Sequence, residues 1–197
     1  MLARRWFVAA TLIGAGIWAG LSLRIVQVAD DEMAPSLRAG DWVVLGPAEV
    51  DPGDVVWLDD PSEPGRKVLR RVVAIEDHPV RFRGGRLVTG GKGVPIKEMG
   101  RVDDRTVLAE ANRWLIAHRA PMPSYAAAEL VVGEDELYVL ADNRDLGVDS
   151  RWWGPVPEVA AERELWLRLG ASDAWRDAVL VGSEDGPWAK PTVEPPS

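Results

Sequence analysis

The sequence predicts an all-β fold, a mostly antiparallel β-domain preceded by one N-terminal transmembrane helix. Short apolar or β-branched runs of strand length recur between residues 42 and 169, and turn residues such as DPGD at 51–54 and GG at 84–85 separate them. One uncharged stretch, residues 6–23, is long enough to cross a bilayer core, which takes about 17–25 helical residues. Strands do not alternate with helical patterns, so a parallel sheet with crossover helices is not expected.

The transmembrane helix is expected over residues 6–24, between the pair Arg4 and Arg5 and the single Arg24. Its apolar core is longer than the roughly 7–15 residues of a secretory signal, and it lacks a clean pair of small residues at cleavage spacing. We therefore predict a retained anchor, with a cleaved signal as the alternative. The basic N-terminus, residues 1–5, is then cytoplasmic, and the chain after the anchor faces outward. Membrane lipid is an expected partner.

The β-domain is expected over residues 25–169. Its strands are predicted, in chain order, at residues 42–45, 55–58, 68–75, 80–82, 86–88, 106–109, 114–117, 137–140 and 165–169. From Gly170 onward the chain carries acidic residues and ends in the proline-rich EPPS. Residues 170–197 are therefore predicted to form a poorly ordered tail.

Composition excludes several classes of function. The chain has 23 basic and 31 acidic residues and a net charge of -8, which argues against a nucleic-acid partner. It has no cysteine, so it can form no disulfide and has no thiol nucleophile. His78 and His118 have no carboxylate or second histidine at ligand spacing and are interpreted as surface or turn residues. We expect no metal site and no cofactor.

Three segments of the β-region stand out by their motifs. Residues 30–45 have the sequence DDEMAPSLRAGDWVVL. In the second segment, GDVVWLDDP at 53–61 is followed by KVLRRVVAI at 67–75. The third, residues 136–157, is ELYVLADNRDLGVDSRWWGPVP.

In this order, the segments resemble the conserved boxes of bacterial type I signal peptidase. The first resembles a stretch in which a catalytic serine precedes Met-x-Pro-Thr-Leu and Gly-Asp, and the second resembles a Gly-Asp strand and a Lys-Arg-Val strand. The third resembles the box Gly-Asp-Asn-Arg-Asp-x-Ser-x-Asp-Ser-Arg-x-Trp-Gly and is the most specific. Repressor-type and phage-type self-cleaving domains share the serine and lysine boxes but lack the third, so they match less well.

The resemblance implies a serine/lysine peptidase fold with its residues in defined roles. The nucleophile position is Glu32, the base position is Arg70, the oxyanion position is Asp30 and the lysine-orienting position is Gly147. A guanidinium with a pKa above about 12 cannot accept the proton, and an aspartate repels an oxyanion. Attack by a carboxylate on an amide would give an anhydride. We therefore expect no intact catalytic residue, and an ion pair between Glu32 and Arg70.

The positions around these replacements keep the family's residue types and are expected to build the groove. They are Met33, Pro35, Asp142, Asn143, Arg144, Asp149, Ser150 and Arg151. The density of Asp and Arg after an apolar strand predicts a loop pinned by charge-assisted hydrogen bonds, with a solvated charged turn as the alternative. We also expect the three segments to converge near one groove.

Functional hypotheses of different classes follow. The first is a non-catalytic homologue in the bacterial cytoplasmic membrane, single-pass with its domain outside, which binds signal peptides, preproteins or an active signal peptidase. The second is an active signal peptidase I-type endopeptidase with an altered site. Its most direct form, a relocated dyad of Ser36 and Lys67, is disfavoured because strand alternation puts Lys67 opposite Arg70. The third is a purely structural membrane-associated domain.

Overall fold

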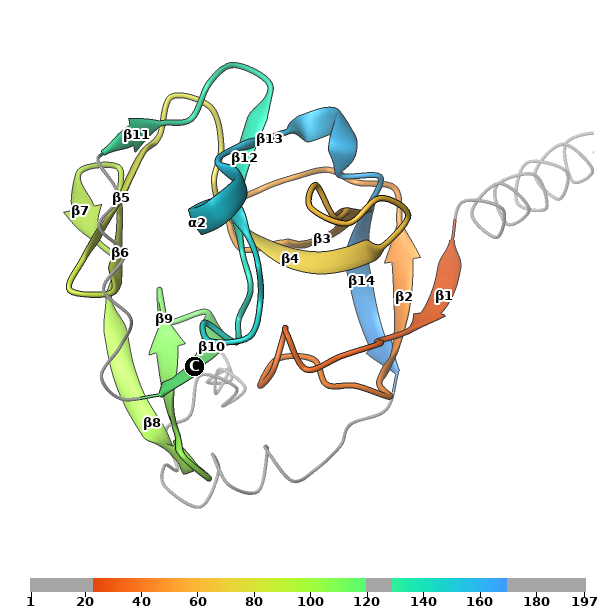
Figure 1. Ribbon diagram of the computed structural model, residues 1–197, viewed down its shortest axis with the longest axis horizontal. Coiled ribbons are helices and arrows are strands. Elements are labelled where there is room, and N and C mark those ends of the chain that lie inside the picture. Colours follow the sequence, from red (N-terminus) through yellow and green to blue (C-terminus); the bar gives the residue numbers. More distant parts are fainter. Residues whose placement is uncertain (1–22, 120–128, 170–197) are drawn as a thin grey trace, which may run out of the picture.

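The computed structural model describes residues 23–119 and 129–169, which form three antiparallel sheets with little helix (Figure 1). The largest sheet has seven strands, in the order β1 (Arg24–Gln27), β2 (Trp42–Gly46), β14 (Arg163–Leu169), β3 (Val55–Asp59), β4 (Lys67–Ala74), β12 (Glu136–Leu140) and β13 (Val156–Pro157). The predicted antiparallel β-domain is therefore confirmed.

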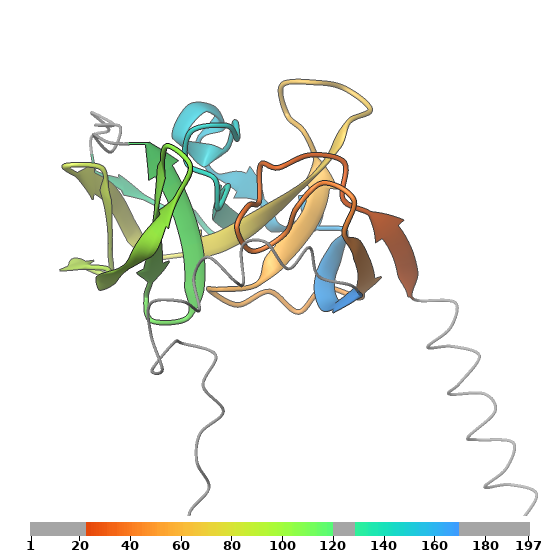
Figure 2. The same cartoon turned by 90° about the horizontal axis from the view of Figure 1, so that it is seen from below.

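Two smaller sheets lie beside the large one, as the view in Figure 2 also shows. One contains β10 (Trp114–Arg119), β9 (Arg105–Glu110) and β8 (Ile96–Val102). The other contains β11 (Leu130–Val131), β5 (Pro79–Arg83), β6 (Arg86–Thr89) and β7 (Lys92–Gly93). Two short helices, α2 (Ser150–Trp153) and the 3-10 helix η1 (Glu158–Ala160), lie between β12 and β14 in the sequence.

All nine strands predicted from the sequence are present, with ends that differ by at most two residues. The longer strands that the sequence analysis missed are β1 and β8. In β8, IKEMGRV, only Met99 is buried, so its charged residues interrupt the apolar run by which a strand is recognised. In β1, Arg24 had been placed at the end of the anchor, and it is the first residue of the strand.

Residues 6–22 of the predicted anchor and the whole predicted tail, residues 170–197, lie outside the described residues. Within residues 23–119 and 129–169, no helix is both long and apolar enough to span a membrane. One expectation was wrong: His118 is not a surface or turn residue but is buried on β10. Its ring Nδ1 lies 2.7 Å from the carbonyl oxygen of Arg119.

The core is built around β4, in which every residue after Lys67 is buried. Val73 and Ala74 belong to a hydrophobic cluster shared with β5, β6, β10 and β12, and Val68 and Val72 belong to a second cluster with β3 and β12. Because β4 is covered on both sides, Arg70 and Arg71 in its middle are enclosed as well. A buried charge is costly unless it is paired, so these arginines must find partners inside the protein.

Candidate functional site: a buried ion-pair cluster

Glu32 and Arg70 form the centre of the site. Arg70 comes from β4 and Glu32 from the loop that joins β1 to β2, and the Arg70 Nη2 lies 2.5 Å from the Glu32 Oε2. The side chains are 1% and 13% exposed, so the pair is almost fully enclosed. The ion pair predicted from the sequence is therefore confirmed.

The rest of the Arg70 guanidinium is also bonded. Its Nε and Nη2 donate to the carbonyl oxygen of Val148 at 3.0 and 2.8 Å, and its Nη1 donates to the carbonyl oxygen of Leu69 at 2.6 Å. The Trp153 ring covers one face, with the Arg70 Cζ 5.6 Å from the ring centroid. A guanidinium has no acceptor atom, and this one is held as a cation, so it cannot take a proton from a nucleophile.

Arg66 is a member of the site that the sequence analysis missed. Its Nη2 lies 2.9 Å from the Glu32 Oε1 and 3.0 Å from the Asp30 Oδ2, and its Nη1 lies 3.2 Å from the Asp60 Oδ2. The hydrogen bond to Glu32 raises the pKa of Arg66 further above its usual value. The sequence spacing could have indicated this role, because residues separated by an even number lie on the same side of an extended chain, as Arg66 and Arg70 do.

Asp30 completes the cluster at the expected oxyanion position. Its Oδ1 accepts a hydrogen bond from the Glu32 backbone N–H at 3.0 Å, while its other oxygen pairs with Arg66. The carboxylates of Asp30, Glu32 and Asp60 thus surround two guanidiniums. These five residues pair opposite charges, but none of them is a hydroxyl nucleophile or a neutral base; the neighbouring Ser62 hydroxyl donates to the Asp60 Oδ1 at 2.5 Å.

The third segment meets the first at this cluster. The Asn143 backbone N–H donates to the Glu32 carbonyl oxygen at 2.9 Å, and the Asn143 side-chain amide donates to the carbonyl oxygen of Asp31 at 3.1 Å. Because Arg70 also bonds the carbonyl of Val148, all three segments converge here. The expected convergence is confirmed.

The expected pinned loop is present, but most of its charges pair outside it. Asp149 and Arg151 pair with each other inside the loop, through a two-point contact of 2.7 Å at each carboxylate oxygen. Three others reach the sheets. Asp142 accepts from Arg71 of β4 at 2.8 and 2.6 Å, and Arg144 pairs with Glu110 of β9. Asp145 accepts from the Arg119 backbone N–H of β10 at 2.6 Å.

The remaining structural positions are also enclosed. Met33 is buried in the hydrophobic cluster beside β2, and Pro35 follows a cis peptide bond. The Ser150 hydroxyl accepts from the Val139 backbone N–H at 3.0 Å. The loop is thus pinned by bonds that run to neighbouring strands.

Ser36 and Lys67 do not form a dyad. The Ser36 hydroxyl donates to the carbonyl oxygen of Leu115 at 3.2 Å, whereas the Lys67 ammonium pairs with Glu162 at 2.5 Å and Asp59 at 2.9 Å. The hydrogen bond to Glu162 raises the pKa of Lys67, which favours the protonated form over the neutral amine that a general base requires.

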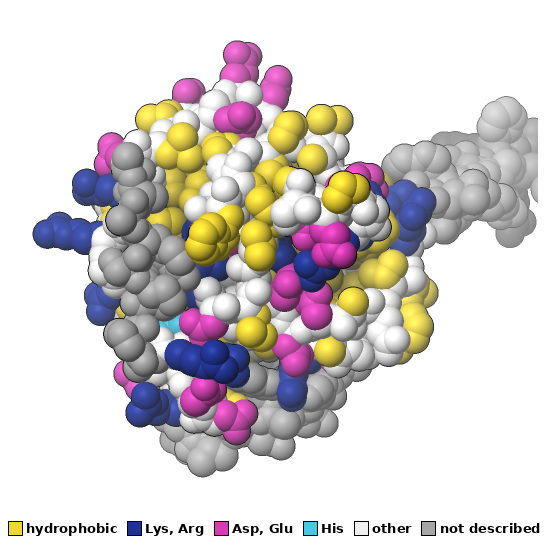
Figure 3. All heavy atoms as spheres, in the orientation of Figure 1, with side chains coloured by type: hydrophobic (Ala, Val, Ile, Leu, Met, Phe, Trp, Pro, Cys, Tyr) yellow, Lys and Arg dark blue, Asp and Glu magenta, His cyan; other side chains and the backbone are white. Residues whose placement is uncertain are grey.

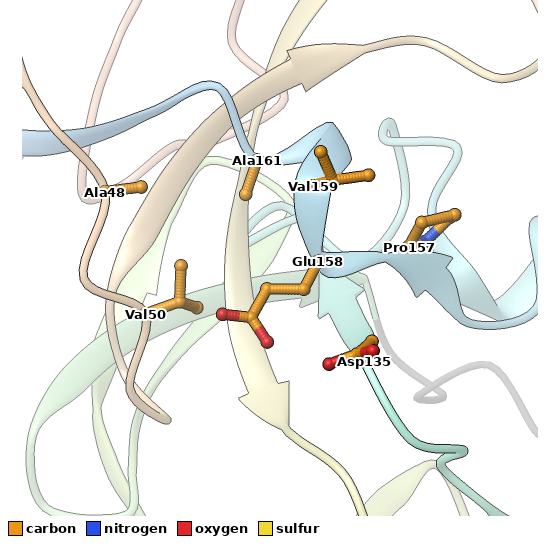
Figure 4. Close-up of a pocket in the computed structure, with 7 residues that line it drawn as sticks. All are labelled: Ala48, Val50, Asp135, Pro157, Glu158, Val159 and Ala161. Carbon is orange, nitrogen blue, oxygen red and sulfur yellow. The ribbon is translucent and has the colours of Figure 1, made fainter.

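A separate hollow of about 460 Å³ lies between the β2–β3 loop and the segment around η1 (Figure 4). The carboxylates of Asp135 and Glu158 point toward it. Its lining includes these two carboxylates but no hydroxyl nucleophile and no cation, so we do not place the functional site there. The lining residues are Ala48, Val50, Asp135, Pro157, Glu158, Val159 and Ala161.

The face of the molecule in Figure 3 has two zones. Hydrophobic side chains gather over its upper half, where Figure 1 shows α2 and β13, and acidic and basic side chains alternate below them. The exposed apolar residues of the α2 region are Leu146, Val148 and Trp152.

Comparisons with known proteins agree with the motifs. The family model described as "Signal peptidase, peptidase S26" matches residues 2–163. Signal peptidase I of Haemophilus influenzae is 32% identical over 77 residues, which are 38% of this chain and 22% of that protein. Signal peptidase I of Pseudomonas fluorescens is 28% identical over 153 residues, 64% of this chain and 54% of that protein.

A crystal structure of a signal peptidase I from Enterococcus faecalis aligns over 61% of this chain and all of the other chain, with 21% identity and a TM-score of 0.43. The chain spans about half of the length of the Pseudomonas fluorescens protein and about a fifth of the Haemophilus influenzae protein.

Proposed function

The chain belongs to the signal peptidase family, peptidase S26, and on that premise we propose that it is a non-catalytic, membrane-anchored homologue with a binding or regulatory role in signal-peptide processing or protein export. Its ligands would be signal peptides or preproteins, or an active signal peptidase. One observation carries the proposal: Glu32 and Arg70 form a buried ion pair where the family places its nucleophile and base.

Restoring acyl-transfer chemistry at this pair would require more than a shift in pKa. The reaction needs a nucleophile, a base that can accept its proton, and a donor for the oxyanion. Here the three positions are a carboxylate already held by two arginines, a guanidinium, and the carboxylate of Asp30. The alternative, an active peptidase with an altered site, has no observation in its favour among the described residues.

Membrane anchoring is the second part of the proposal. We place residues 1–5 in the cytoplasm and an anchor after them that ends at residue 23, one residue before the predicted end, because Arg24 begins β1. The domain up to residue 169 lies outside the bacterial cytoplasmic membrane, and a tail covers residues 170–197. Support comes from an exposed apolar face on β1, β2 and β14, which begins directly after the anchor. This lipid-facing patch consists of Ile25, Trp42, Trp166, Leu167 and Leu169.

The strand register aligns the patch. Ile25 lies opposite Val44, which lies opposite Leu167, and Trp42 lies opposite Leu169. Cross-strand partners share a face of the sheet, so these side chains project together. Leu23 immediately precedes β1, so a helix that ends there would leave the patch at the bilayer surface, where tryptophan is favoured.

The proposed function is tested with the full chain in lipid vesicles and a signal-bearing preprotein. A photo-crosslinking amino acid replaces Trp152, which is exposed and precedes the Trp153 that covers Arg70. A control variant carries it at Val131, which is exposed on β11. We expect crosslinks to the signal peptide from position 152, few from position 131, and no cleavage.

Each other outcome selects a different function. Cleavage of the preprotein would make the protein an active peptidase and would refute the non-catalytic proposal. Equal crosslinking from both positions, or none from either, would favour a structural domain that does not recognise signal peptides.

A further inference from the structure

Gly147 lies against Ala141, and the contact leaves no room for a side chain. A Cβ atom added to Gly147 would lie 2.1 Å from the Ala141 Cβ, a distance that real Cβ atoms do not adopt. The next neighbours, the Ala141 Cα at 3.6 Å and the Arg70 Cζ at 3.8 Å, are at ordinary contact distances. The Ala141 methyl group is therefore the group that excludes a Cβ at position 147.

The obstacle is steric and not conformational. Gly147 is not among the glycines with positive φ, so its backbone suits any L-residue. With glycine at position 141, a Cβ atom at 147 would have its two next neighbours at ordinary contact distances.

Neither backbone can easily move away. The Ala141 backbone N–H donates to the Asp149 Oδ2 at 2.9 Å, and the Gly147 carbonyl accepts from the Arg151 Nη2 at 3.2 Å. Asp149 and Arg151 are themselves paired, so one buried ion pair holds both sides of the contact. Overpacking here must break a bond or force a shift of the loop.

We propose that Ala141 is a positioning residue of the site: its methyl group and any side chain at position 147 are mutually exclusive. In the family box that the third segment resembles, glycine stands at the position of Ala141 and serine at that of Gly147. Here alanine replaces that glycine and glycine replaces that serine, so one Cβ atom remains in the contact.

The consequence for the site follows from the neighbouring residue. With no side chain at 147, the adjacent Val148 carbonyl comes close enough to accept from both Nε and Nη2 of Arg70. While the Ala141 methyl is present, a side chain at 147 would force the loop to shift, which would displace this carbonyl and weaken its hydrogen bonds to Arg70. The ion pair of Glu32 and Arg70 is thus stabilised by the packing of Ala141 against Gly147 as well as by charge. This inference rests on the proposed non-catalytic function, but its first test measures packing alone and does not depend on that function.

The first test is a stability cycle on the full chain, with Gly147→Ser, Ala141→Gly and the double variant. We expect Gly147→Ser to lower Tm by roughly 3–10 °C and the double variant to recover most of that loss. Gly133→Ser is the control, because a Cβ there would meet only the flexible end of Glu136 at 2.7 Å, and Ala141→Gly should not rescue it. A double variant whose loss equals the sum of the two single losses would overturn the inference.

The second test measures preprotein cleavage by a variant that already carries Glu32→Ser, Arg70→Lys and Asp30→Ser. Gly147→Ser should raise preprotein cleavage only when Ala141→Gly is also present. A full gain from Gly147→Ser alone would overturn the inference. If the stability cycle shows rescue but no variant cleaves, the packing inference stands, and the proposed survival of the substrate groove fails.

Discussion

Neutralising Glu32 should destabilise the protein far more than neutralising a surface carboxylate. In Glu32→Gln, Arg70 remains a cation that is 1% exposed, and its other hydrogen bonds within the described residues go to the neutral carbonyls of Leu69 and Val148. Removing one partner of a buried ion pair costs about 3–5 kcal/mol. For a protein of this size that corresponds to a fall in Tm of roughly 6–20 °C.

The reverse change should cost less, because the two partners differ in their surroundings. In Arg70→Met, Glu32 keeps the Arg66 Nη2 at 2.9 Å and its partial access to water. We expect a loss of about 1–3 kcal/mol. The double variant Glu32→Gln/Arg70→Met should cost less than the two single losses together, because no unpaired charge is then left inside.

The assay is urea unfolding of the full chain in detergent, followed by tryptophan fluorescence. A matched control is the pair of Lys67 and Glu162, which has the same N–O distance of 2.5 Å but side chains that are 26% and 46% exposed. Its coupling energy should stay below about 1 kcal/mol. If the losses at Glu32 and Arg70 are additive and no larger than in the control, the reasoning from burial is refuted.

Three further predictions concern other parts of the domain. Burial raises the pKa of Tyr138 to about 12. The stability that its neutral phenol provides is therefore complete below pH about 10 and is lost as the pH rises toward 12. This loss of about 2–3 kcal/mol, measured by urea unfolding at each pH, should be absent in Tyr138→Phe. Burial and the nearby carboxylates raise the pKa of Glu164. The ionised side chain therefore destabilises the folded state, and this loss of stability appears as the pH rises through that pKa. Glu164→Gln should raise Tm by about 1–3 °C at pH 7 and should not change it at pH 4. The chain has no cysteine, so an environment-sensitive fluorophore can be attached to Leu167→Cys; its emission should shift to the blue in vesicles, and a Val131→Cys control that shifts equally would rule out the lipid-facing patch.

Strand positions were predictable because burial imposes a pattern on the sequence. Each strand that packs into the core repeats apolar residues at strand period, which is visible without any knowledge of its partners. β8 was missed because it buries only Met99 and contributes little of that pattern. His118 was misassigned because a histidine that bonds a backbone carbonyl next to it carries no sequence signal of burial.

The pair of Glu32 and Arg70 was predictable because motif order and charge complementarity both pointed to it. Arg66 was not recognised, although its even spacing from Arg70 was available, because a turn residue before a strand is ordinarily solvated. Its role depends on how the Asp30–Glu32 loop folds back onto β4, a contact between segments 34 to 36 positions apart in the sequence.

The sequence by itself determined the family, the strand pattern and the absence of a serine and lysine at the expected positions, because these depend on residue identity and local periodicity. Only the tertiary structure decided which charges neutralise one another: Asp142 pairs with Arg71 of β4 and not with its own loop. It also showed that the methyl of Ala141 occupies the space beside Gly147. Such contacts depend on distances of a few tenths of an ångström between residues on different segments, and no residue type or spacing in a single sequence specifies them.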